Sequence, residues 1–322
     1  MKSLKTILAC VAFIAGAPPA FSQAYPSKPI LLVVSTAPGA GTDLMGRTVA
    51  ERLGPRLGTT LVVENRAPAA GLVAAQTFKR ATADGYSLLF TNDNLVLMMA
   101  LGANKDVNVI TDFQPVVFTA YSDFYLVVTG EALQAKTALD LVRMAKQKPG
   151  ALSYATPGNG APHHLGMELF KQQTGADIVH VPYKGMGPAL PDLIGGRVQV
   201  TLTGLPAVAS HLNSGKLRIL GVASSRRTAE LPDVPTLAEA GIPNVEIQGY
   251  NYLVAPLGTP AAIVERLNRE INEVIRIPAV QEELAKRGTT AAGGTPEQLT
   301  QKLRAEAEKW TAVVKRAGIK PD

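Results

Sequence analysis

The sequence predicts an α/β protein of two lobes, each a mostly parallel sheet flanked by helices. Short β-branched and aliphatic runs alternate with amphipathic helical patterns along the chain, which is the order of βαβ units. This alternation starts again near residue 124, where a second sheet is expected to begin. The 298 residues that follow residue 24 (322 − 24) exceed what one hydrophobic core usually serves, and this length also favours two lobes.

The first 24 residues have the pattern of a secretory signal peptide. Lys2 and Lys5 precede an apolar run that ends at Ala17, and small residues follow, with acceptable cleavage after residue 22 or 24. The run is too short to span a membrane. Cys10, the only cysteine, lies inside it, so the exported chain is expected to hold no disulfide and no thiolate metal site.

The charge of the chain argues against nucleic acid as a partner. The formal net charge is +6, and it becomes +4 without Lys2 and Lys5. The basic residues are scattered among acidic ones, whereas a nucleic-acid-binding face needs clustered basic residues. After residue 24 no stretch reaches the roughly 18 apolar residues of a membrane-spanning helix.

The first part of the chain predicts a βαβαβ unit. Its opening apolar run suits a strand that is buried on both faces of a parallel sheet. We expect Gly54 to end the first helix. The expected strands are Pro29–Val34, Leu61–Glu64 and Tyr86–Thr91, and the expected helices are Thr42–Leu53 and Leu72–Arg80.

The second part repeats this pattern and then ends in two helices. Thr259-Pro260 and Thr295-Pro296 each read as a capping residue followed by proline at the first helical position. Helical spacing predicts that Trp310 lies in the core. The other expected elements are strands at Phe124–Val128, Leu152–Ala155, Ile178–Val181, Val198–Leu202, Leu217–Ala223 and Tyr252–Ala255, and helices at Leu139–Gln147, Pro162–Thr174 and Gly187–Ile194.

Two segments share one design, a strand followed by a Pro-Gly-x-Gly loop and a helix. The loops are Pro38-Gly39-Ala40-Gly41 and Pro157-Gly158-Asn159-Gly160, and they start 119 residues apart (157 − 38). Glycines let consecutive backbone amides point at a ligand, and a helix that begins there adds unpaired N–H groups and the positive end of its dipole. Two such loops facing each other would bind a small dianion, or an anion with a polar far end.

The alternative is that these loops are ordinary connectors. One Pro-Gly loop alone is more often a tight turn, and Asp43 fits a helix cap equally well. The repetition of the spacing in a two-lobed exported chain favours binding. The loops do not match nucleotide motifs, because no third glycine or Gly-Lys-Ser/Thr follows at the required offset.

The sequence offers little for catalysis or metal binding. His163 and His164 are adjacent and therefore diverge on a helix, and no His-x-x-x-His pair or Gly-x-Ser-x-Gly elbow occurs. The apolar stretch Leu95–Leu101 is either core or part of a pocket wall. We therefore predict no catalytic residue, no metal site and no cofactor.

Six short motifs occur in order along the chain from residue 24. They are residues 24–30 (Ala-Tyr-Pro-Ser-Lys-Pro-Ile), 62–66 (Val-Val-Glu-Asn-Arg), 84–86 (Asp-Gly-Tyr), 112–116 (Asp-Phe-x-Pro-Val), 180–185 (His-Val-Pro-Tyr-Lys-Gly) and 231–236 (Leu-Pro-Asp-Val-Pro-Thr). Together they resemble the Bug family, the TctC-like extracytoplasmic receptors of tripartite tricarboxylate transporters, and the resemblance covers the chain after residue 24.

The resemblance implies a type II periplasmic binding protein, the two-domain Venus flytrap, which is not an enzyme. It implies a periplasmic location, a small carboxylated ligand, membrane permease subunits as partners and a monomer. We expect residues 25–124 and 250–322 to form domain 1 and residues 125–249 to form domain 2. The implied ligand-binding residues are Thr36, Pro38, Gly39, Ala40, Gly41, Thr42, Asp43, Asn92, Asn94, Thr156, Gly158, Asn159, Gly160, Ala161, His164, Thr203 and Tyr250.

The chain departs from the family pattern at several of these positions. An aromatic residue is replaced by Thr36, and two aspartates are replaced by Gln199 and Thr203, which predicts a larger and less acidic pocket. We therefore expect a ligand bulkier than the short dicarboxylates. The other departures are Ala40 for glycine, Ala161 for serine and Tyr250 for tryptophan.

Two other functions fit the sequence. One is an orphan receptor that presents its solute to a membrane signalling protein. The other is an exported α/β enzyme, for which His164 and Asp43 are the only pair of catalytic residues that the sequence suggests.

Overall fold

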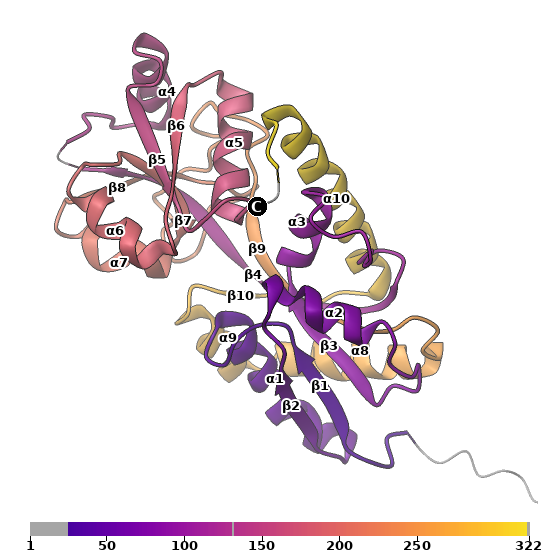
Figure 1. Cartoon of the computed structure of the whole chain (residues 1–322). Helices are drawn as coiled ribbons and strands as arrows, with labels where there is room; N and C mark the ends of the chain where they lie inside the picture. The colour runs from indigo at the N-terminus through magenta and orange to yellow at the C-terminus, as the bar shows by residue number, and fades with distance from the viewer. Residues whose placement is uncertain (1–24, 131, 321–322) are drawn as a thin grey trace, which may run out of the picture.

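The computed structural model describes residues 25–130 and 132–320, and the predicted signal peptide lies outside these residues. Figure 1 shows two lobes. Lobe 1, lower in this view, contains the first and last elements of the described chain, and the C-terminus lies at the junction with lobe 2. Its elements are β1 Ile30–Val34, α1 Gly41–Leu57, β2 Leu61–Asn65, the 3-10 turn Ala69–Gly71, α2 Leu72–Phe78, β3 Ser87–Asn92, α3 Asn94–Ala100, α8 Ala261–Ile275, α9 Pro278–Ala285, β10 Thr290–Ala291 and α10 Pro296–Ala317.

Lobe 2 is the upper lobe in Figure 1, and it is formed by the middle of the chain. Two long strands, β4 Phe113–Thr129 and β9 Gln248–Pro256, connect it with lobe 1. Its other elements are α4 Ala138–Gln147, β5 Leu152–Thr156, α5 Pro162–Thr174, β6 Ile178–Pro182, α6 Met186–Ile194, β7 Val200–Gly204, α7 Leu205–Leu212 and β8 Leu217–Val222.

The sheet is continuous from one lobe to the other through β4. The strand order is β2-β1-β3-β9-β4-β7-β5-β6, and β8 and β10 also pair with β4. In lobe 1, β1 is parallel to β2 and β3, and in lobe 2, β5 is parallel to β6 and β7. Up to Asp123, β4 pairs with β9, and from Phe124 it pairs with β7, so one strand serves both sheets.

The strand predicted at Phe124 is therefore only the lobe 2 half of β4. The half in lobe 1 contains Pro115 and the polar pair Ser122-Asp123, which interrupt the apolar run that would identify a buried strand.

The C-terminal helix α10 packs against both lobes. Trp310 is 2% exposed, as predicted for a core residue, and its indole Nε1 donates to Glu306 Oε2 at 2.7 Å. About one turn further along the helix, Gln172 Nε2 of α5 donates to the Val313 carbonyl at 3.0 Å, which joins lobe 2 to α10. Figure 1 shows α10, in yellow, reaching α5.

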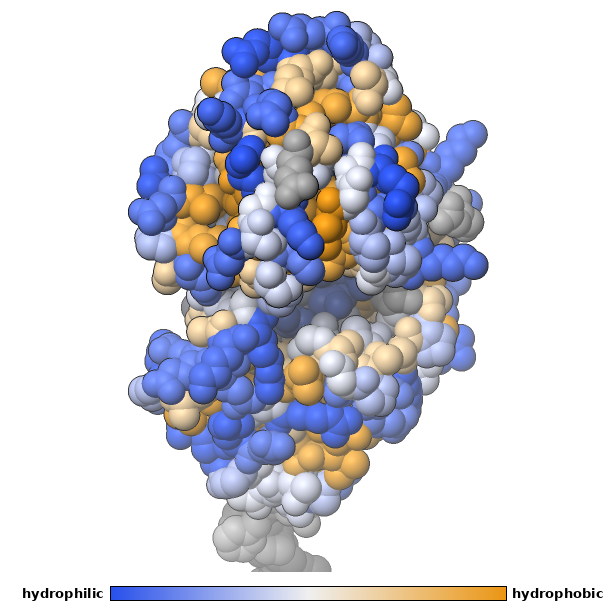
Figure 2. All heavy atoms as spheres, turned by 90° about the vertical axis from the view of Figure 1, so that its left-hand side faces the viewer, coloured by the Kyte–Doolittle hydropathy of each residue, from blue (hydrophilic) through white to orange (hydrophobic). Residues whose placement is uncertain are grey.

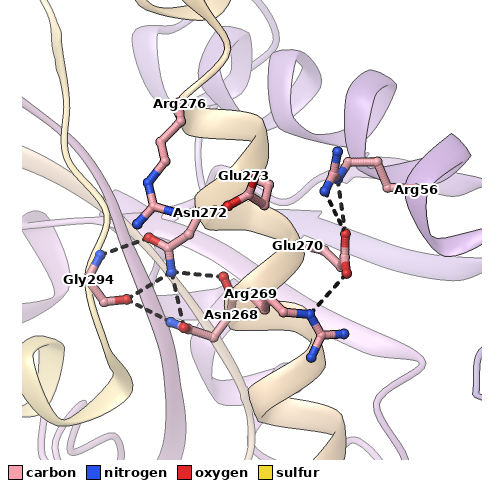
Figure 3. A network of polar contacts seen from close by, with 8 residues as sticks. All are labelled: Arg56, Asn268, Arg269, Glu270, Asn272, Glu273, Arg276 and Gly294. Carbon is pink, nitrogen blue, oxygen red and sulfur yellow. Dashed lines mark hydrogen bonds and ion pairs between the residues drawn. The ribbon is translucent and has the colours of Figure 1, made fainter.

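Helix α8 fixes the segment that leads into α10. Asn272 accepts from the Gly294 amide at 2.9 Å and donates to the Gly294 carbonyl at 3.0 Å, and Asn268 donates to the same carbonyl at 2.8 Å. Glu270 of α8 also pairs with Arg56 at the end of α1 (Figure 3). Side-chain amides thus replace backbone pairing where the chain turns toward α10.

The prediction that Gly54 ends the first helix, α1, is wrong. The helix continues through Pro55 to Leu57, and Gly58 takes the left-handed conformation that ends it. Gly54 is needed for another reason, because a Cβ added there would lie 2.8 Å from the Thr59 carbonyl oxygen.

Of the two helix starts predicted from Thr-Pro pairs, at α8 and α10, only that of α10 is capped by its threonine. Thr295 caps α10 in a capping box with Gln298. At α8 the N-cap is Pro260, and the Thr259 hydroxyl donates to the Pro256 carbonyl instead. Helices α7 and α9 were not predicted, because eight residues are too short for a clear helical period.

No helix in the described part of the chain has the length and apolar character needed to cross a bilayer.

The close approach at Gly54 gives a stability prediction. Gly54→Ala should destabilise the protein by about 1–3 kcal/mol, because the new Cβ meets backbone that cannot move freely. Gly187→Ala in α6 is the matched control, because nothing lies within 4 Å of an added Cβ there, and it should be neutral or slightly stabilising. Urea unfolding of both variants checks this, and equal midpoints would contradict it.

Candidate ligand-binding cleft

The helices that follow the parallel strands begin at one edge of each sheet. In lobe 1, α1 and α3 follow β1 and β3, and in lobe 2, α5 and α7 follow β5 and β7. The carboxyl ends of parallel strands lie at the same edge, so these helix N-termini gather there. Figure 2 shows a recess across the molecule between lobe 2 above and lobe 1 below, which we call the cleft.

At two of the places where the lobes meet, a glycine of one lobe lies against an apolar side chain of the other. A Cβ added to Gly160 of lobe 2 would lie 2.6 Å from Leu101 Cδ1 of lobe 1. A Cβ added to Gly288 of lobe 1 would lie 2.8 Å from Pro206 Cγ of lobe 2. Both glycines also have positive φ, which other residues rarely adopt, and a Cβ at either position would require the opposing side chain to move.

The loop before α1 is held by a carboxylate from the helix that it leads into. The N-cap residue is Ala40, whose methyl side chain cannot accept a hydrogen bond from the helix. Gly39, with φ of 82°, donates its amide to Asp43 Oδ2 at 2.8 Å. Asp43 thus does not cap the helix as the N-cap residue, but reaches back from the third helical position to the residue before the cap.

The loop before α5 is held in the same way by a histidine. Ala161 is the N-cap, with φ and ψ of −62° and 157° against −68° and 157° at Ala40. Gly160, with φ of 69°, donates its amide to His164 Nδ1 at 3.1 Å. We call each of these bonds, from the residue before the N-cap to the third helical residue, an N3 clamp.

The N3 clamps show which residues of the two loops are equivalent, and this differs from the prediction. Gly39 matches Gly160 and Ala40 matches Ala161, which is an offset of 121 (161 − 40) and not the 119 predicted from the prolines. The helix start sets the correspondence, and loop 2 has two more residues between its proline and its N-cap. Gly41 is consequently the first residue of α1 and has no positive φ.

A network around Asp43 fixes the loop of lobe 1. Arg47 Nε donates to both Asp43 oxygens at 3.0 Å, and Asn65 Nδ2 donates to Asp43 Oδ1 at 2.7 Å. The same Asn65 amide donates to the Thr36 carbonyl at 2.9 Å. Burial raises the pKa of Asp43, but the hydrogen bonds from Arg47, Asn65 and Gly39 outweigh it, so the pKa is lowered and the carboxyl stays charged.

Stacked rings fix the clamp of lobe 2. The His164 ring lies on His180 with centroids 3.9 Å apart, and His180 lies on Tyr154 at 4.9 Å. His180 Nε2 and Thr156 Oγ1 are hydrogen-bonded at 2.7 Å, which connects the stack to the end of β5. Burial lowers the pKa of His180. His164 accepts at Nδ1, so its ring is neutral and carries its proton on Nε2.

The asparagines predicted as ligand contacts tie α1 to α3. Asn92 Nδ2 donates to Thr42 Oγ1 at 3.1 Å, and Asn92 Oδ1 accepts from the Asn94 amide at 3.2 Å. The sequence analysis missed Asp93 between them. Asp93 is 7% exposed, and burial raises its pKa to about 7, against the effect of nearby backbone amides. A charged residue directly after a buried strand is the signal that could have identified Asp93 from the sequence.

Other predicted site residues lie in different surroundings. Pro38, Gly39, Gly41 and Asn159 are exposed at the loop tips, whereas Thr36, Ala40, Gly158 and Ala161 are half-buried. Thr203 is 1% exposed in β7. Tyr250 is 2% exposed and belongs to the core, where its ring lies 5.9 Å from Phe118.

The expectation that Gln199 makes the pocket less acidic is wrong. Gln199 Oε1 accepts from the Ser153 amide at 2.9 Å, and its Nε2 donates to the Gly196 carbonyl at 2.7 Å. Ser153 lies near the start of β5, whereas the loop before α5 follows the end of that strand. Gln199 therefore lies at the edge of the sheet opposite the cleft.

Within residues 25–130 and 132–320, no three His, Cys, Asp or Glu side chains gather in an arrangement that could hold a metal ion.

Two α/β lobes connected by crossing strands, with helix N-termini of both lobes at one cleft, define a periplasmic solute-binding protein, which is a receptor and not an enzyme. The chain belongs to the family described as the tripartite tricarboxylate transporter family receptor, TctC, whose model matches residues 45–319. Membership of the Bug or TctC-like receptors, the two-lobed fold and the non-enzymatic class are thereby confirmed.

Individual relatives agree with this family over nearly the whole chain. Protein BugT of Bordetella pertussis is 37% identical over 306 residues, 94% of each chain. A solved R. palustris protein with adipate is 35% identical with a TM-score of 0.76, over 92% of this chain and all of that one. MatC from Rhodopseudomonas palustris with bound malate is 27% identical with a TM-score of 0.72, over 90% and 100% of the two chains.

The network around Asp43 predicts a pH-dependent difference in stability. Asp43→Asn should lose about 2 kcal/mol at neutral pH, because a charged, hydrogen-bonded carboxylate becomes a neutral amide. A lowered pKa in the folded state stabilises above the unfolded value of 3.8, so the difference should persist above about pH 5 and shrink as the pH falls below 3.8.

Urea unfolding of the wild type and Asp43→Asn between pH 3 and pH 7 measures this difference. Glu51→Gln removes an exposed carboxylate from the same helix and should change stability by less than about 0.5 kcal/mol. A difference between wild type and Asp43→Asn that does not shrink at low pH would contradict the prediction.

Proposed function

We propose that this protein is a periplasmic receptor that binds a small carboxylated solute in the cleft, through backbone amides at the N-termini of α1 and α5. It would deliver the solute to the membrane permease subunits of a tripartite tricarboxylate transporter. The observation that carries the proposal is the pair of N3 clamps, one in each lobe. Each clamp uses one loop amide internally and holds the remaining amides of its helix start in a fixed orientation.

The donors available to a carboxylate follow from the helix geometry. The first residues of an α-helix have no intrahelical acceptor for their N–H groups, and the helix dipole favours an anion there. In α1 these donors belong to the first three helical residues, Gly41, Thr42 and Asp43. In α5 they belong to His163 and His164, because Pro162 has no N–H.

The proposed contacts need no basic side chain. None of the residues that form the two loops is lysine or arginine. Arg47, the nearest cation along α1, is already paired with Asp43. A site made from backbone amides grips a carboxylate without a buried ion pair, which favours release of the solute to a partner.

The relatives support the class of solute. The R. palustris protein and MatC have adipate and malate bound, and both are carboxylates. We propose a carboxylate for this chain as well, bulkier than the short dicarboxylates because Thr36 stands where the family pattern has an aromatic residue.

We also propose how the chain divides and where it acts. Residues 25–124 with 250–322 would form domain 1 and residues 125–249 domain 2, and the change of partner strand along β4 at Phe124 supports this boundary. Residues 1–24 would direct export to the periplasm and be removed, and the receptor would act as a monomer.

A screen of carboxylates tests the proposed solute class. Thermal unfolding of the exported protein should shift upward with one or more of adipate, malate, succinate, glutarate and bulkier aliphatic or aromatic carboxylates, because a ligand that binds only the folded state stabilises it. The uncharged amides of the same compounds are the controls and should give no shift. If only sugars or other uncharged compounds shift the transition, the carboxylate proposal is wrong.

A proline at position 41 tests the role of the backbone amides. Gly41→Pro removes one N–H, and the backbone accepts it because Ala40 already has the extended conformation that precedes proline. The Ala161-Pro162 pair of lobe 2 shows the same arrangement. Gly41→Ala keeps the N–H, and its Cβ would meet nothing within 4 Å, so it is the matched control.

Calorimetric titration with the best carboxylate from the screen measures the effect. Gly41→Pro should weaken binding about 10-fold or more, the usual value of one hydrogen bond to a charged group, with little change in unfolding temperature. Gly41→Ala should bind like the wild type. Equal binding by wild type and Gly41→Pro would show that this amide does not contact the carboxylate.

A further inference from the structure

One segment of lobe 2, residues 226–228, binds β4 on both sides of the point where this strand passes between the lobes. The passage lies between Asp123, which pairs with β9, and Phe124, which pairs with β7. On the lobe 1 side, Arg226 Nη2 donates to the Tyr121 hydroxyl. On the lobe 2 side, the hydroxyl groups of residues 125 and 228 are hydrogen-bonded at 2.8 Å.

Arg226 is attached firmly to lobe 2. Its segment follows β8, and the Ser224 hydroxyl donates to the Arg226 carbonyl. Two residues further on, Thr228 is 7% exposed, and its hydrogen bond with Tyr125 is buried. Because the backbone is held on both sides of Arg226, its guanidinium moves with lobe 2 when the lobes rotate.

Tyr121 is attached equally firmly to lobe 1. A β-bulge at Thr119 adds one residue to β4, so Phe118 and Tyr121 face the same side of the strand. Their rings stack with centroids 6.3 Å apart and planes at 8°. Lys302 Nζ of α10 lies 5.3 Å from the Phe118 centroid, and Arg226 Cζ lies 5.9 Å from the Tyr121 centroid, so a cation lies against each ring.

The bond between Arg226 and Tyr121 lies beside a place where the lobes meet. Tyr121 pairs with Thr290 of β10, and two residues earlier Gly288 lies against Pro206 of lobe 2. Arg226, Tyr121 and Thr290 line a common cavity of about 220 Å³. Side chains therefore do not fill the space between the lobes here, and a polar contact crosses it instead of a packed interface.

We infer that Arg226 is a positioning residue for solute binding, whose bond with Tyr121 stabilises the arrangement in which the lobes are in contact. We call this bond the hinge latch. A rotation that separates Gly288 from Pro206 would also separate Arg226 from Tyr121, because each pair joins the two lobes at the same side of β4. The inference rests on the proposed function for its effect on solute binding, but not for its effect on the shape of the ligand-free protein.

The hinge latch should change affinity without changing selectivity. The fraction of molecules in the binding-competent arrangement multiplies the apparent association constant of every solute by the same factor. A residue that touches the solute changes the affinity of different solutes by different factors. One hydrogen bond corresponds to about a 2- to 10-fold change in an equilibrium constant.

The test uses variants of the exported protein that remove one side of the hinge latch at a time. Tyr121→Phe removes the hydroxyl and keeps the ring, and Arg226→Ala removes the donor. Arg226→Lys keeps a charged donor and should restore part of the effect. Arg227→Ala is the matched control, because this neighbouring arginine pairs with Glu239 inside lobe 2.

Two measurements are made on each variant. Calorimetric titration with adipate, malate, succinate and glutarate should show one common loss of affinity, about 2- to 10-fold, in Tyr121→Phe and in Arg226→Ala. The double variant should lose no more than either single variant, because both remove the same bond. Small-angle X-ray scattering should give these variants a larger radius of gyration than the wild type without solute and an equal one when saturated. Arg227→Ala should match the wild type in both measurements.

Three outcomes would overturn the inference. Losses of affinity that differ between carboxylates would mean that Arg226 contacts the solute. Unchanged affinities, or a ligand-free radius of gyration equal to that of the wild type, would mean that the bond does not hold the lobes together. If no carboxylate binds the wild type, the proposed function fails separately, and the ligand-free radius of Tyr121→Phe alone then decides on the hinge latch.

Discussion

The hydrogen bond from the residue before a helix to the third residue inside it is the interaction on which the cleft depends. It satisfies one amide of the turn and fixes the angle at which the helix start meets the strand before it. The amides that remain then point in a direction that the fold has set before any solute arrives, and such preorganisation lowers the cost of binding. The lobes reach this geometry with different chemistry. Lobe 1 uses a carboxylate held by a guanidinium and an amide, and lobe 2 uses an imidazole held by two stacked rings.

Because of this difference, the two sides of the cleft differ in charge and in the number of backbone donors. The Asp43 clamp stays charged and is balanced by Arg47, so it adds little net charge to its side of the cleft. The lobe 2 side has neutral histidines and one backbone donor fewer, because Pro162 starts α5.

Much of the architecture could be predicted from local sequence patterns. Helix α5 has the predicted bounds, Trp310 is buried, and the restart of the βα alternation marks the second lobe. Features set by contacts between distant segments were missed. No local pattern predicts that β4 serves both sheets or that Gly54 is needed against Thr59. The loops were identified from their glycines, but their correspondence was shifted by two residues, because the helix start sets it and the proline does not. Gln199 was misplaced because a position in the family pattern does not tell which edge of the sheet the residue occupies.

The two glycine contacts between the lobes have a consequence for how such receptors diverge. Each lobe contributes one glycine and one apolar side chain, with Gly160 against Leu101 and Pro206 against Gly288. A larger residue at either glycine requires the opposing side chain to move or to be smaller, so the two residues of each pair constrain each other's substitutions although they lie 59 and 82 positions apart (160 − 101 and 288 − 206). Among relatives, these positions are therefore expected to change together, while the loop tips between them remain free to follow the solute.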